Sequence, residues 1–79
     1  MDNSRKFRSI VATILGIPED HVTDDLSSEV VDTWDSLNQI NLIGALEQEF
    51  GVLLATENLA DAQSVPKLRA LLAKEGIAV

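Results

Sequence analysis

Residues 33–38, Thr-Trp-Asp-Ser-Leu-Asn, place a serine hydroxyl where it could carry a phosphate ester. The apolar pattern that follows predicts a helix to Phe50, and Asp35 suits its N-cap because a short carboxylate can accept an N–H of the first turn. Ser36 then takes the first helical position, beside unpaired backbone N–H groups and the positive end of the helix dipole. Helix N-termini favour phosphate. The sequence therefore predicts that Ser36 can hold a negatively charged phosphodiester.

The predicted helix carries apolar residues on two different sides. An α-helix turns by about 100° per residue, which places Leu42, Ile43, Leu46 and Phe50 within one sector of the helix surface. This sector is about 100° wide, the width of the apolar stripe on a core-facing helix. Leu37 points about opposite the centre of that stripe, and Ile40 lies about 105° from it. A single surface leucine is common and needs no explanation. Two apolar side chains beside a serine at a helix start indicate a contact patch for a partner.

The preceding part of the chain predicts a helix and then a long loop. Asn3 or Ser4 can cap the helix and Gly16 ends it, with a full apolar stripe formed by Phe7, Ile10, Val11, Ile14 and Leu15. From position 18 to position 34 no period is sustained, which indicates a loop. The residues expected to pin this loop to the core are Val22, Leu26 and either Val30 or Val31.

The following part predicts two more helices. A short one runs from Thr56 or Glu57 to Asp61, and a last one is capped by Ser64 and ends at Gly76. The apolar side of the last helix contains Val65, Leu68, Leu71 and Leu72. We therefore expect one all-α domain over residues 1–79. It is a small four-helix bundle of three main helices plus one short helix, with a long loop between helices 1 and 2.

The charges are distributed unevenly along the 79 residues. The net charge is −7, all six Lys and Arg lie within positions 5–8 and 67–74, and eleven Asp or Glu lie from Glu19 to Asp61. This acidic segment would repel nucleic acid and anionic lipid and attract basic protein surfaces. The chain has no cysteine, no membrane-spanning run and no calcium-loop spacing. We expect a cytoplasmic monomer that binds no metal, nucleic acid or membrane.

The motif Asp35-Ser36-Leu37, with Leu42 and the run Ala45-Leu46-Glu47-Gln48-Glu49-Phe50-Gly51 after it, resembles that of acyl carrier proteins. The resemblance covers nearly the whole chain. It implies that a phosphopantetheinyl transferase moves 4′-phosphopantetheine from coenzyme A to Ser36, and that the arm then holds acyl groups as thioesters. The chain itself would not be an enzyme.

The resemblance also implies which residues the partner enzymes contact. Enzymes that load or process the acyl group, such as a ketosynthase, an acyltransferase or an acyl ligase, would bind through basic surfaces. The implied contact residues are Asp35, Leu37, Ile40, Asn41, Gly44, Glu47, Gln48 and Glu57.

Three positions after the serine differ from the usual fatty-acid carrier pattern. That pattern places acids at the second and fifth positions and a bulky apolar residue at the eighth, where this chain has Asn38, Asn41 and Gly44. It also usually has a Leu-Gly pair shortly before the motif, which is absent here. The differences favour specialised, polyketide-like acyl assembly over housekeeping fatty acid synthesis. Peptidyl and D-alanyl carriers share the fold and stay open as alternatives.

Two readings without a carrier arm also account for parts of the sequence. An unmodified acidic bundle could bind a partner protein through the patch beside Ser36. A serine hydrolase would need His21, the one histidine, as its base. Ser36 does not stand in a G-x-S-x-G elbow and no strand precedes it, which disfavours the hydrolase.

Overall fold

The computed structural model describes residues 2–54 and 62–79. These residues form the helices α1 (Asn3–Leu15), α2 (Ser36–Phe50) and α3 (Val65–Lys74), with one 3₁₀ turn, η1 (Glu19–His21), between α1 and α2. No strand occurs in these two ranges, where one isolated antiparallel bridge joins Ser27 and Ser64. The predicted all-α fold with a long loop between the first two helices is confirmed. The predicted short helix ending at Asp61 lies outside the described residues.

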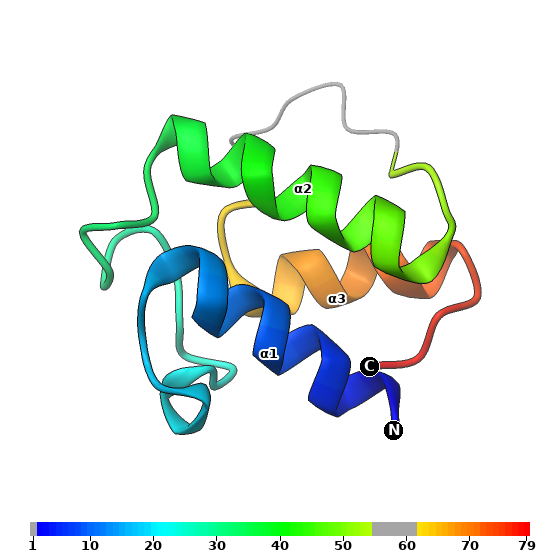
Figure 1. The fold of residues 1–79 in the computed structure, drawn as a ribbon, viewed down its shortest axis with the longest axis horizontal. Coiled ribbons are helices and arrows are strands. Elements are labelled where there is room, and N and C mark those ends of the chain that lie inside the picture. Colours follow the sequence, from blue (N-terminus) through cyan, green and yellow to red (C-terminus); the bar gives the residue numbers. More distant parts are fainter. Residues whose placement is uncertain (1, 55–61) are drawn as a thin grey trace.

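The three helices enclose one hydrophobic core. α1 and α2 lie side by side and run in opposite directions (Figure 1), and α3 contributes its apolar side to the same buried cluster. The predicted stripes supply that cluster, since the buried side chains include Phe7, Val11, Leu15, Leu42, Ile43, Leu46, Val65, Leu68 and Leu72. The remaining stripe residues pack partly buried at its edge: Ile10, Ile14, Phe50 and Leu71.

The first helix begins one or two residues earlier than the two predicted caps imply. Asp2 is its N-cap, and the Asp2 carboxylate accepts the backbone N–H of Arg5 at 2.8 Å. The prediction of Asn3 or Ser4 as the cap is wrong because both residues already lie within the helix. The Ser4 hydroxyl instead donates to the backbone carbonyl of Val79 at 2.9 Å, which holds the C-terminus beside the first turn of α1 (Figure 1).

Helices α1 and α2 both end at a glycine in the left-handed conformation. Gly16 has φ 69° and Gly51 has φ 65°, values that glycine adopts without a Cβ penalty. The residue after each glycine donates back into the helix: Ile17 N–H to the carbonyl of Ala12, and Val52 N–H to the carbonyl of Glu47. The predicted end of α1 at Gly16 is confirmed.

The long loop is anchored both to the core and to α3. Val22 and Leu26 are buried as predicted, and of the two remaining candidates Val31 packs partly buried whereas Val30 is 68% exposed. Val30 therefore does not pin the loop. The carbonyl of Leu26 accepts the N–H of Val65, and Ser28 N–H donates to the carbonyl of Gln63, each at 3.0 Å. These bonds hold the loop against the start of α3.

The sequence predicts no membrane-spanning run. Among the described residues, no helix combines the length and the apolar character that crossing a bilayer requires.

Candidate functional site

Ser36 stands at the open N-terminal end of α2. The Asp35 carboxylate accepts the N–H of Asn38 at 2.8 Å, and the Asp35 carbonyl accepts the N–H of Gln39 at 2.9 Å, which confirms Asp35 as the N-cap. The N–H groups of Ser36 and Leu37 and the Ser36 hydroxyl have no hydrogen-bond partner in the described part of the chain. This end of the helix keeps donors that can face an anion.

Exposure distinguishes Ser36 from the other serines. The chain has six, all within the described ranges, and Ser36 is the one whose side chain is exposed rather than partly buried. Ser64 also stands at a helix start, but as the N-cap of α3 its hydroxyl oxygen accepts the N–H of Lys67 at 3.2 Å. An exposed, unpaired hydroxyl beside free N–H donors fits the attachment of a phosphodiester-linked arm. The exposure and free hydroxyl of Ser36 therefore favour it over Ser64 as the attachment residue.

Behind Ser36, the interior contains a polar pair that the sequence analysis did not single out. The indole Nε1–H of Trp34 donates to the side-chain carbonyl of Gln39 at 2.7 Å, and Gln39 Nε2 donates to the backbone carbonyl of Ala62 at 3.2 Å. Trp34 is 3% exposed and Gln39 is 1% exposed. Helical spacing could have predicted that Gln39 is buried. Gln39 precedes Leu42, Ile43 and Leu46 by three, four and seven positions, which places it on the core-facing stripe of the helix.

The first turns of α2 have a second set of side-chain hydrogen bonds on their solvent-facing side. Asn38 Nδ2 donates to the backbone carbonyl of Thr33 at 2.7 Å, and Asn41 Nδ2 donates to Asn38 Oδ1 at 3.2 Å. The Thr33 hydroxyl in turn donates to the carbonyl of Leu15 at the end of α1. Asn38 thus has a structural contact that its position in the motif did not indicate.

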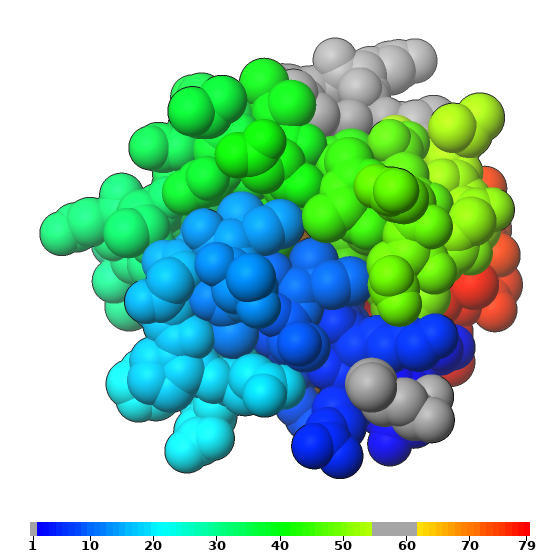
Figure 2. All heavy atoms as spheres, viewed as in Figure 1, coloured from blue at the N-terminus to red at the C-terminus, as the bar shows by residue number. Residues whose placement is uncertain are grey.

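The predicted partner patch is largely at the surface. Leu37 is 67% exposed and Ile40 is 54% exposed, while the core-facing side of α2 is buried. Four other predicted partner residues are also exposed: Asp35, Asn41, Gly44 and Gln48. Figure 2 shows side chains of α2 forming much of the upper surface in that view. The described part of the predicted patch therefore includes a continuous side of α2.

Two of the predicted partner residues need separate treatment. Glu47 is partly buried, and its carboxylate accepts the backbone N–H of Leu54 at 2.8 Å, so it holds the chain that follows α2. Glu57 lies outside the described residues.

The remaining ionisable groups supply no catalytic or metal arrangement in the described ranges. His21 is exposed in η1, and no hydrogen bond joins it to Ser36. No group of three or more His, Asp or Glu is arranged to hold a metal ion there. Two acidic residues pair with the basic ends of the chain, Glu49 with Lys6 at 3.9 Å and Asp24 with Arg69 at 3.0 Å. Most of the described acidic residues therefore stay free for other charges.

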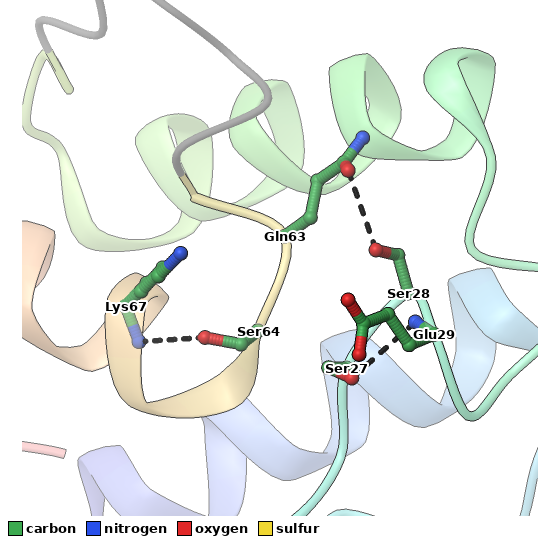
Figure 3. A pocket seen from close by; sticks show the side chains of 6 residues that line it. All are labelled: Ser27, Ser28, Glu29, Gln63, Ser64 and Lys67. Carbon is green, nitrogen blue, oxygen red and sulfur yellow. Dashed lines mark hydrogen bonds between the residues drawn. The ribbon is translucent and has the colours of Figure 1, made fainter.

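A polar pocket lies where the long loop meets α3. Its volume is about 300 Å³ and its lining residues are Ser27, Ser28, Glu29, Gln63, Ser64 and Lys67 (Figure 3). The Ser28 hydroxyl donates to Gln63 Oε1 at 3.3 Å, and the Ser27 hydroxyl oxygen accepts the N–H of Glu29 at 3.3 Å. These side chains join the loop to the helix start. None of them belongs to the predicted site on α2.

Comparison with known proteins agrees with this geometry. A family model described as "Phosphopantetheine attachment site" matches residues 5–72. The disease resistance protein Piks-1 of Oryza sativa subsp. japonica is 34% identical over 73 residues, a match that covers 91% of this chain and 6% of that protein. The chain thus spans a small part of the length of this relative. Domains of the matched family carry a covalently attached 4′-phosphopantetheine, which confirms the cofactor expected from the sequence. This chain belongs to the phosphopantetheine-attachment family, the carrier class that includes the acyl carrier proteins.

Proposed function

We propose that the chain is an acyl carrier protein, a single domain that holds acyl intermediates as thioesters on an arm attached at Ser36. The observation that carries the assignment of Ser36 is its exposed, unpaired hydroxyl at the mouth of a fifteen-residue helix. The free N–H groups of Ser36 and Leu37 favour the negative charge that the new phosphodiester brings. The family match supports the arm itself.

The attachment needs a transferase and coenzyme A. Ser36 Oγ forms a bond to the phosphorus that bears the pantetheine, the pyrophosphate P–O bond of coenzyme A breaks, and 3′,5′-adenosine bisphosphate leaves. The hydroxyl proton passes to a base outside this chain, because His21, the chain's one histidine, is exposed in η1 and no hydrogen bond joins it to Ser36. The chain contributes an accessible nucleophile and a helix end that stabilises the product charge.

The partners of the loaded carrier are enzymes that add, extend or remove the acyl group. Leu37 and Ile40 offer an apolar contact beside Ser36, and the acidic bias of the chain from Glu19 to Asp61 attracts basic rims on a partner. Such enzymes are a ketosynthase, an acyltransferase or an acyl ligase. The chemistry of acyl transfer then belongs to the partner, and the carrier supplies the substrate on a long arm.

The side of α2 that meets these enzymes supports a specialised role. Asn41 and Gly44 are exposed there, and a Cβ added at Gly44 meets no atom within 4 Å. Position 44 can therefore accept a larger side chain without a clash, and the exposed Asn41 adds only its hydrogen bond to Asn38, so both positions can serve in selecting a partner. We propose polyketide-like or other dedicated acyl assembly, with peptidyl and D-alanyl carriage as the alternatives for the cargo.

The attachment can be tested by intact mass. The purified chain is incubated with coenzyme A and a broad-specificity phosphopantetheinyl transferase, and we expect the mass of one phosphopantetheine to be added. Ser36→Ala should abolish the addition. Ser64→Gly is the matched control, because it removes a second helix-start serine while glycine keeps most of the capping free energy, and it should be modified like the unaltered chain.

Two results would contradict the proposal. Modification of the Ser36→Ala variant would move the attachment to another residue. Failure of the unaltered, folded chain to be modified would favour an unmodified acidic interaction module.

A further inference from the structure

Two consecutive side-chain amides of α2 hold the two consecutive residues that precede its cap. Asn38 Nδ2 donates to the Thr33 carbonyl at 2.7 Å, and Gln39 Oε1 accepts the Trp34 indole N–H at 2.7 Å. Asn38 makes its contact on the outer side, and Gln39 makes its contact in the core. Residues 33–34 and the first turn of α2 are therefore tied together from both sides, with Ser36 between them.

The inner contact is the more demanding of the two. Both the Trp34 indole and the Gln39 amide are almost completely buried, and buried polar groups lose their hydration whether or not they find a partner. Gln39 also donates to the Ala62 carbonyl, so one side chain links the Ser36 turn to the segment that leads into α3. Opening the turn would break this set of bonds inside the core. The bonds consequently favour one conformation of the turn.

Ser36 has no such bond of its own. Its hydroxyl is exposed and unpaired within the described residues, so the direction in which it points depends on the backbone on either side. That backbone is fixed by the Asp35 cap and by the contacts of Asn38 and Gln39. Nucleophilic displacement is sensitive to such placement, because a misplacement of about 1 Å can cost about 100-fold in rate.

We propose that Asn38 and Gln39 are positioning residues for the modification of Ser36. They hold Thr33 and Trp34 against the first turn of α2 and thereby present the Ser36 hydroxyl to the transferase. This inference rests on the proposed attachment at Ser36. Gln39 is the sharper test of the two, because a side chain that is 1% exposed cannot touch the transferase and can act only through its neighbours.

The experiment compares Gln39→Met with the unaltered chain. Methionine has a similar volume and reach but neither accepts from the Trp34 indole as an amide does nor donates to the Ala62 carbonyl. Transferase kinetics are measured with the carrier as the varied substrate, and we expect kcat to fall between about 10-fold and about 100-fold. KM for the carrier should change by less than about threefold, because the docking surface on α2 is intact.

Two readouts do not depend on the transferase. Hydrogen exchange of the Trp34 indole N–H, followed by NMR, should become at least about tenfold faster in Gln39→Met, because its acceptor is lost. Circular dichroism and thermal unfolding show whether each variant is folded at the assay temperature. The chain has one tryptophan, so the indole signal needs no assignment by mutation.

Two further variants separate positioning from general stability. Trp34→Phe removes the donor instead of the acceptor, and combined with Gln39→Met it should lower kcat by less than the product of the two single effects. Leu71→Ala truncates a partly buried residue near the C-terminal end of α3, which lies toward the far end of α2 from Ser36 in Figure 1. It should lower the melting temperature and leave kcat for the folded chain unchanged.

The outcomes distinguish this inference from the proposed attachment. An unchanged kcat in folded Gln39→Met, or an equal fall in Leu71→Ala, would overturn the positioning role while leaving Ser36 as the attachment site. If kcat falls in Gln39→Met while the exchange rate of the Trp34 indole N–H stays the same as in the unaltered chain, the positioning role is also overturned. Modification of Ser36→Ala would instead remove the premise.

Discussion

The Thr33 hydroxyl donates a 2.7 Å hydrogen bond to the backbone carbonyl of Leu15. Leu15 is the last residue of α1, and the carbonyls of a last helical turn have no partner within their own helix. Thr33 lies three residues before Ser36, so this bond joins the end of α1 to the chain that enters α2. It closes the long loop between the two helices at its base.

Thr33→Val should lower the free energy of unfolding by about 1 kcal/mol. Valine keeps the shape of the side chain but removes the hydroxyl, and a partly buried hydrogen bond contributes about that amount. Urea unfolding followed by circular dichroism measures the difference. Thr13→Val, at an exposed position of α1, is a control for the change in residue type. If Thr33→Val is as stable as the unaltered chain, a hydrogen bond from water to the Leu15 carbonyl replaces that from Thr33 at no cost in free energy.

Leu37→Ala and Ile40→Ala should weaken partner binding more than they weaken the fold. Both side chains are more than half exposed, whereas Leu46 is fully buried. Leu46→Ala should approach the cost of about 2–5 kcal/mol that is typical of a buried leucine, and the two surface variants should stay well below it. Melting temperatures give the order of the three variants. Leu37→Ala unfolding as readily as Leu46→Ala would show that the exposed side of α2 contributes to the core.

Partner binding should weaken as salt is added. The acidic residues from Glu19 onward would meet basic side chains of a partner at an exposed surface, where the screening length falls from about 10 Å at about 0.1 M salt to about 3 Å at about 1 M. Titration calorimetry with a cognate transferase over that range measures the affinity. An affinity that does not change with salt would mean that the acidic segment serves solvation alone.

Gly44→Ala should stabilise the chain by up to about 1 kcal/mol. Gly44 lies inside α2, where glycine is less favourable than alanine by about that amount, and an added Cβ meets nothing within 4 Å. Thermal unfolding measures the gain. Transfer of an acyl group to a partner enzyme is measured on the same variant. A more stable chain with slower transfer would indicate that a partner uses the space left by the missing side chain.

A fatty acid synthase reconstituted from separate enzymes should elongate malonyl groups poorly on this carrier. The motif alone suggests that Asn38→Asp, Asn41→Glu and Gly44→Met together would restore the rate. The structure changes the expectation for one of them, since an aspartate at position 38 cannot donate to the Thr33 carbonyl as Asn38 does. We therefore expect Asn41→Glu with Gly44→Met to restore elongation better than the triple variant does.

The comparison needs the synthase's own carrier as the reference. Elongation on the unaltered chain at a rate comparable with that reference would refute the specialised role. Equal rates for the double and triple variants would show that the Asn38 contact does not matter for elongation.

Local patterns in the sequence were sufficient to predict the three described helices and the exposed position of Ser36 at the start of α2. The cap at Asp35, the stop at Gly16 and the exposed side of α2 each depend on neighbours within a few positions, so residue type and helical spacing determine them. The family motif around Ser36 is equally local. The same local patterns do not locate the cap of α1, which lies one or two residues before the predicted Asn3 or Ser4. Asp2, Asn3 and Ser4 are all good capping types, and only the geometry of the first turn separates them.

Tertiary structure alone decided which polar residues hold the Ser36 turn. Gln39 lies on the apolar side of α2, but a glutamine there is buried only if other parts of the chain supply its partners, here the Trp34 indole and the Ala62 carbonyl. Val30 and Val31 are equivalent by type and adjacent in sequence, and the path of the loop buries one and exposes the other. Such outcomes depend on contacts between residues distant in the sequence, which no local period or propensity encodes.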